Sequence, residues 1–106
     1  MSVLETNQLD AAGVSEDGKC LTLLITDHLG WEKEYDHLIL LQDKLNSYMA
    51  FLESEQWKEY FPDTVERAEI EIDFKYDITP NCERFLQTVQ DQFGQCGVRI
   101  KAVIGE

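Results

Sequence analysis

Six side chains that could bind a metal ion or move a proton are concentrated in one short stretch of the chain. They are two histidines and four carboxylates: Asp27, His28, Glu32, Glu34, Asp36 and His37. Histidine and carboxylate groups are common zinc ligands, and a positioned histidine or carboxylate can act as a general base. This stretch is therefore the first place to look for catalysis.

The spacing within the stretch gives little support to a metal site. Glu34 and His37 are three residues apart and would share a helix face, whereas His28 would have to fold back from a loop. A histidine at the acidic start of a helix is most often a surface residue or a cap partner, and we interpret His37 in this way.

No His-Glu-x-x-His motif, glycine-rich phosphate loop or Gly-x-Ser-x-Gly elbow occurs in the sequence. We therefore expect no catalytic residue, cofactor or metal. The alternative is a small metal-binding protein or metal-dependent enzyme that uses His28, His37 and the nearby carboxylates.

A strand that ends near Asp27 and a long helix after it must position these residues. From residue 31 to residue 57 the chain has no Gly or Pro, and a helix of this length would measure roughly 40 Å. Asp27 is expected to act as an N-cap or Asx-turn residue, and 53–55 is where the helix should break. Apolar residues recur at the helical spacing at Trp31, Tyr35, Leu38, Leu41, Leu45, Tyr48 and Leu52.

The rest of the chain predicts four strands and a second helix. Asp17-Gly18 is a strong hairpin signal between strands at 9–14 and 20–26. Apolar and charged residues alternate at 67–76 and again at 98–104, as in half-buried strands. Thr79-Pro80 begins a helix that reaches about residue 95. The last strand is expected to bury Val98, Ile100, Ala102 and Ile104.

The element order ββαβαβ predicts an α+β domain with two layers, a four-stranded sheet with both helices on one face. Acids on the wet side of the strand at 67–76 would complement Arg99 and Lys101 if the last two strands are neighbours. We expect residues 1–106 to form a single domain, with residues 1–8 as a loose N-terminal lead.

The charge indicates which partners to expect. Twenty-one acidic residues against nine basic ones give a formal net charge of −12. Nucleic acids and anionic membranes are bound through clustered Lys and Arg, so neither is an expected partner, whereas a basic protein is.

The apolar runs and the cysteines indicate the compartment. No apolar run approaches the ~18 residues of a membrane span, and the first residues do not resemble a signal peptide, so a cytoplasmic location is expected. Cys20, Cys82 and Cys96 form no Cys-x-x-Cys pair, and we interpret them as reduced thiols.

Aromatic residues gather near the end of the long helix, in an acidic surrounding. The group that could form a partner-binding surface is Trp57, Tyr60, Phe61, Glu55 and Glu59. Aromatic anchors inside an acidic rim suit a basic protein surface. The competing interpretation is that these rings close one end of the core. We interpret the chain as a non-enzymatic protein-binding module, such as an immunity or inhibitor protein for a basic toxin or nuclease.

The stretch Thr26-Asp27-His28-Leu29-Gly30-Trp31 resembles a family of small bacterial proteins that is catalogued only as a domain of unknown function. The resemblance extends to Pro62-Asp63 and to the alternating strand at 70–76, and covers roughly residues 9–104. It implies the same helix and strand register and a bacterial source, and it carries no activity or site residue. Along the helix it rests on His37-Leu38, Leu41-Gln42, Lys44-Leu45-Asn46, Tyr48 and Phe51-Leu52-Glu53-Ser54.

Overall fold

A computed structural model describes residues 11–54, 56–59, 61 and 64–105. The predictions for residues 1–10, Glu55, Tyr60 and 62–63 lie outside this part of the chain. The described elements are β1 (Ala11–Val14), β2 (Cys20–Asp27), α1 (Glu34–Glu53), the short 3-10 helix η1 (Gln56–Glu59), β3 (Arg67–Phe74), α2 (Pro80–Gly94) and β4 (Val98–Ile104).

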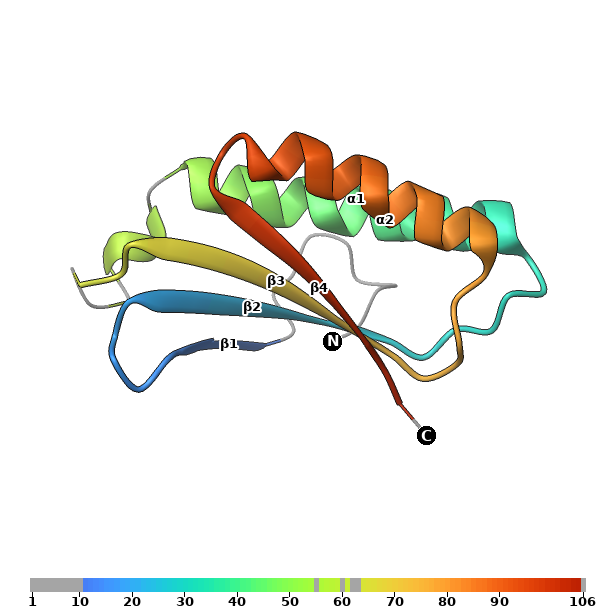
Figure 1. The fold of residues 1–106 in the computed structure, drawn as a ribbon, viewed down its shortest axis with the longest axis horizontal. Coiled ribbons are helices and arrows are strands. Elements are labelled where there is room, and N and C mark those ends of the chain that lie inside the picture. The colour runs from blue at the N-terminus through green and yellow to red at the C-terminus, as the bar shows by residue number, and fades with distance from the viewer. Residues whose placement is uncertain (1–10, 55, 60, 62–63, 106) are drawn as a thin grey trace.

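The strands form one sheet in the order β1-β2-β3-β4, and α1 and α2 both lie on the same face of it (Figure 1). β1 and β2 are antiparallel, and their turn contains Gly18 with φ of 74°. β2, β3 and β4 are mutually parallel because a helix returns the chain between successive strands. The predicted two-layer α+β fold is confirmed.

β3 and β4 are neighbours, which confirms the predicted charge pairing. The pairs lie on the face of the sheet opposite the two helices, which we call the open face. Glu69 lies opposite Arg99, and Glu71 lies opposite Lys101. Lys101 Nζ is 3.8 Å from the Glu71 carboxylate. Opposite charges on directly facing residues stabilise a strand pair modestly.

The core lies between the sheet and the two helices. The side chain of Tyr48 crosses between the layers, and its hydroxyl donates a hydrogen bond of 2.5 Å to the carbonyl of Leu24. In the described part of the chain, no helix combines the length and apolar character needed to cross a bilayer. Fully buried core side chains include Leu21, Leu23, Ile25, Leu41, Ile70, Ile72 and Cys82.

Helix α1 begins at Glu34 rather than at residue 31, and it ends at Glu53, where a break was predicted. The prediction that Tyr35 belongs to the buried face is wrong, because its side chain is 76% exposed. The buried face centres on Leu41, Leu45 and Tyr48, and Tyr35 lies about a third of a turn away from Leu41.

Strand β4 also departs from its predicted burial. Val98 is buried and Ile100 is partly buried, but Ala102 is exposed and Ile104 is 41% exposed. Of the four described strands β4 lies at the edge of the sheet, so none of the others pairs with its outer side. Figure 1 shows its C-terminal end diverging from the helix layer. The apolar alternation therefore predicted the strand correctly but not its burial.

Candidate functional site

The histidine- and carboxylate-rich stretch forms the connection between β2 and α1. Asp27 is the last residue of β2, and its Oδ1 accepts a hydrogen bond of 3.1 Å from the Leu29 N–H. This is the Asx-turn geometry that the sequence predicted for Asp27. The turn leads the chain through Gly30 and Trp31 to the start of α1.

Asp27 and His37 form a buried pair at this connection. Each residue is only 2% exposed, and His37 Nε2 lies 2.5 Å from Asp27 Oδ2. His37 Nδ1 lies 3.0 Å from the Gly30 carbonyl oxygen. A carbonyl oxygen can only accept, so Nδ1 carries a proton and donates it to this hydrogen bond. Both ring nitrogens are therefore occupied, and the interpretation of His37 as a surface residue is wrong.

The indole ring of Trp31 covers this pair. It stacks on the His37 imidazole with ring centroids 3.8 Å apart and an interplanar angle of 20°. Trp31 also lies 6.3 Å from the ring of Phe74 at the end of β3. The expected first residue of the helical stripe thus lies ahead of α1, where it packs against the histidine.

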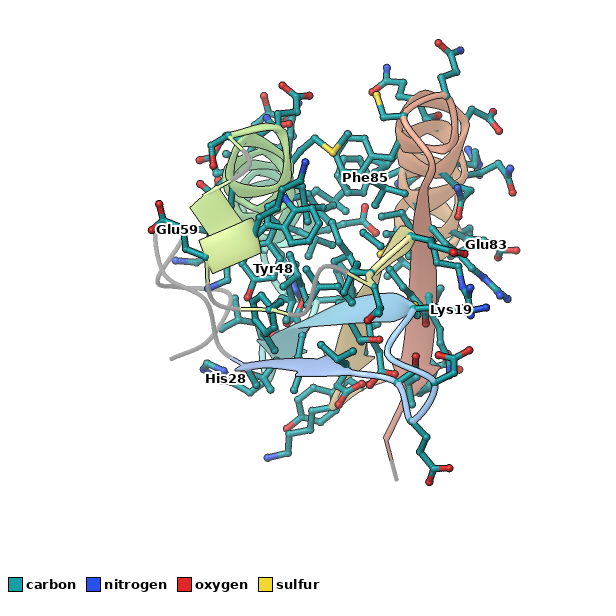
Figure 2. The ribbon with its side chains drawn as sticks, turned by 90° about the vertical axis from the view of Figure 1, so that its left-hand side faces the viewer. Lys19, His28, Tyr48, Glu59, Glu83 and Phe85 are labelled. Atoms are coloured by element: carbon teal, nitrogen blue, oxygen red, sulfur yellow. The ribbon has the colours of Figure 1, made fainter. Side chains whose placement is uncertain are left out.

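Of the other predicted ligands, Glu32 and Asp36 line one surface hollow together with His37, whereas His28 does not. His28 is exposed and projects outward (Figure 2), and Glu32 and Asp36 are exposed as well. Glu34 instead contacts α2, where Asn81 Nδ2 donates a hydrogen bond of 2.8 Å to its carboxylate. Hydrogen bonds from Thr79 and Asn81 lower the pKa of Glu34.

Among the described residues, no group of three or more His, Cys, Asp and Glu side chains is arranged to hold a metal ion. The imidazole of His37 and the carboxylate of Asp27 contact each other. They hold the end of β2 to the first turns of α1.

Cys82 lies near the same end of the molecule, in the first turn of α2. Its side chain is fully buried. Burial raises the pKa of the Cys82 thiol to about 12, and the negative charges of Asp27 and Glu34 add to this effect. Since a thiolate is the nucleophilic form of cysteine, this environment suppresses its reactivity at neutral pH. All three cysteines are free, as predicted.

The predicted aromatic surface lies at the opposite end of α1. Trp57 and Phe61 are both partly buried and pack against the core, and the Trp57 indole N–H donates a hydrogen bond of 2.9 Å to the Leu52 carbonyl. Glu59 is exposed (Figure 2), whereas Glu55 and Tyr60 lie outside the described residues. A binding role for this group stays a prediction.

The structure reveals an exposed apolar group on α1, and one of its members, Tyr35, was predicted to lie on the buried face. Tyr35 and Ile39 are one helical turn apart on the outward face of α1 and are 76% and 38% exposed. Asp36 and Asp43 are exposed on the same helix and flank Ile39 at spacings of three and four residues. We call Tyr35, Ile39, Asp36 and Asp43 the α1 surface. The phase of the helix, set by Leu41 and Leu45, is the signal that could have placed them outward.

The fold and the polar pair define a small acidic α+β domain in which a buried histidine and carboxylate connect the sheet to the first helix. The whole chain, residues 1–106, matches the model of a family of unknown function (DUF6572), and the protein belongs to this family. No curated protein and no solved structure matches the chain.

Proposed function

We propose that this protein is a non-enzymatic binding module that docks onto a basic protein, as an immunity or inhibitor protein does. The observation that carries the proposal is the exposure of Tyr35 on the outward face of α1, in a chain with a formal net charge of −12. Large exposed aromatic side chains beside charged residues are typical anchors of protein interfaces.

The α1 surface combines a short-range anchor with a long-range attraction. Tyr35 and Ile39 supply apolar area that a partner can cover. Asp36 and Asp43 are exposed beside them and supply negative charge. Attraction between opposite charges mainly accelerates association and weakens with salt, whereas the buried anchor controls dissociation. A basic partner with an apolar hollow fits both requirements.

The aromatic group near η1 is the alternative docking surface for the same function. Trp57 is less suited to be an anchor because its ring packs on the core and its N–H is bound to Leu52 within the same chain. We therefore place the partner on α1, and comparison of Tyr35 with Trp57 tests this choice.

The experiment is binding of the purified protein to each basic protein encoded by a neighbouring gene, measured by surface plasmon resonance at several salt concentrations. We expect one complex whose association slows with salt. Tyr35→Ala should weaken it by about 30-fold, the effect of a typical interface anchor, with the melting temperature nearly unchanged. Asp36→Lys should mainly slow association.

Trp57→Ala is the matched variant at the other end of α1. We expect this substitution to lower the melting temperature, and we expect the protein that remains folded to bind the partner as tightly as the unsubstituted protein. Loss of binding in Trp57→Ala at unchanged stability, with Tyr35→Ala unaffected, would move the docking surface to the η1 end. The proposal would be overturned if the association rate did not depend on salt and Tyr35→Ala left the affinity unchanged.

A further inference from the structure

The outer edge of β4 presents backbone groups that face away from the sheet. In a strand, the N–H and C=O of one residue point to the same side, and successive residues alternate. The Gly105 N–H donates to the Phe74 carbonyl of β3 at 2.6 Å, whereas the Ile100 N–H donates to the Gln90 side chain at 2.8 Å. Val98, Ile100, Ala102 and Ile104 therefore direct their backbone groups outward.

The side chain of Gln90 occupies the beginning of this edge. Its Oε1 accepts from the Ile100 N–H, and its Nε2 donates to the Val98 carbonyl at 3.4 Å. The amide thus lies where the peptide group of an additional strand would lie. Beyond Ile100, no other described residue makes a hydrogen bond to the outward groups of Ala102 and Ile104. As far as residues 11–54, 56–59, 61 and 64–105 are concerned, the second half of the β4 edge is open.

A groove lies beside this edge, between β4 and α2, and its volume is about 240 Å³. Ile78, Leu86, Ile100 and Ala102 form its apolar lining, and Glu83, Gln87 and Gln90 form its polar side. Figure 2 shows α2 above β4, with Glu83 on the outer flank. An extended segment added to β4 would place every second side chain in this groove and the others on the open face of the sheet.

The charges on the open face indicate which side chains the added segment should carry. Arg99 and Lys101 are the exposed residues of β4 on this face. On their other side, β3 presents Glu69 and Glu71 to them at matching positions. An added strand is therefore best paired when it also presents acidic side chains here. A second copy of β4 would instead bring two basic strands together.

We propose that the edge of β4 binds, by strand addition, an extended segment of a partner protein in which apolar residues alternate with Asp or Glu. The apolar residues occupy the groove beneath α2, and the acidic residues lie beside Arg99 and Lys101. This surface is separate from the α1 surface, so its test does not depend on the function proposed above.

The probe is a blocked peptide of about seven residues, a common strand length, with Ile and Glu alternating. We expect saturable changes in the amide NMR signals of Ala102, Ile104 and neighbouring α2 residues. A matched peptide with Ile and Lys alternating should bind about tenfold more weakly. N-methylation of one alternate set of peptide residues should abolish binding, and N-methylation of the other set should not.

Two protein variants complete the experiment. Ala102→Pro removes an outward N–H, which an edge strand tolerates because that group does not pair within the sheet. Lys101→Glu reverses a charge on the open face. Each should weaken binding of the Ile/Glu peptide by about tenfold. If Ala102→Pro does not fold, Lys101→Glu and the two methylated peptides still decide the question.

Three results would overturn the proposal. The first is an absence of signal changes at the β4 edge, or changes confined to another surface. The second is equal or tighter binding of the Ile/Lys peptide. The third is self-association through β4 that excludes the peptide, since the occupant would then be a second copy of this chain.

Discussion

The Asp27 carboxylate and the His37 imidazole, ten residues apart in the sequence, meet through a hydrogen bond of 2.5 Å between Oδ2 and Nε2. The bond joins the last residue of β2 to α1, and a second contact from His37 Nδ1 to the Gly30 carbonyl fixes the intervening turn. Both groups are almost fully buried. The protein loses the most stability when only one member of such a buried pair is removed, because the other stays buried without its partner.

His37→Ala should therefore lower the free energy of unfolding by roughly 3–5 kcal/mol. The substitution leaves the buried carboxylate of Asp27 without its imidazole partner and removes the ring on which Trp31 stacks. Urea denaturation followed by circular dichroism measures the change.

His28→Ala is the matched control, because the other histidine is exposed, and it should change stability by less than about 0.5 kcal/mol. Equal effects of the two substitutions would contradict the structural role of the Asp27–His37 pair.

The buried thiol of Cys82 makes the free energy of unfolding depend on pH in the alkaline range. Its pKa is raised on folding from 9.0 to about 12, so the native state holds this proton more tightly than the unfolded state. The stabilisation is complete below pH 9, and it declines by about 1.4 kcal/mol for each pH unit above that value.

In urea melts recorded between pH 8 and pH 11, the free energy of unfolding of Cys82→Ala should decline less steeply with pH. Each protein is compared with its own value at pH 8, because the substitution also lowers stability at that pH. Cys96→Ala, at an exposed cysteine, should leave the decline unchanged. A decline that persists in Cys82→Ala would assign it to another group.

Glu71 and Asp73 are neighbours along the open face of β3, and their interaction is unfavourable when both are ionised. A hydrogen bond with Asp73 is the largest cause that raises the pKa of Glu71 above its usual value of 4.5, and desolvation adds to it. A carboxyl group with a raised pKa stabilises the fold below its unfolded pKa and loses that contribution as the pH rises through its folded value.

Glu71→Gln should therefore raise the melting temperature at pH 7, and the gain should disappear near pH 4. Differential scanning calorimetry at both pH values tests this. Glu69→Gln makes the same change in net charge two residues away and should give a smaller gain. A gain from Glu71→Gln that is the same at both pH values would contradict the explanation.

The arrangement of the histidines predicts that zinc does not stabilise the fold. A ligand stabilises a protein only if it binds the native state, and both nitrogens of the His37 ring are already hydrogen-bonded. The melting temperature should stay constant in a micromolar zinc titration. A saturable increase that is lost in both His28→Ala and His37→Ala would favour the metal-binding alternative.

The sequence by itself determined the features that depend on neighbouring residues. Asp17-Gly18 predicted the first hairpin, Thr79-Pro80 predicted the start of α2, and strict alternation predicted β3. These signals are local because turn geometry, helix capping and the two-residue repeat of a strand are properties of a few consecutive residues.

Only the tertiary structure decided which residues of each element are covered. The side chain of Tyr35 is exposed because it lies about a third of a turn from Leu41 and no described element covers that side of α1, while His37 is buried because its face of α1 packs over the end of β2. The same distinction applies to β4, where Ala102 and Ile104 keep the apolar pattern but lie on the sheet edge. Periodicity specifies the face of an element, whereas burial depends on whether another element reaches that face, which no local pattern contains.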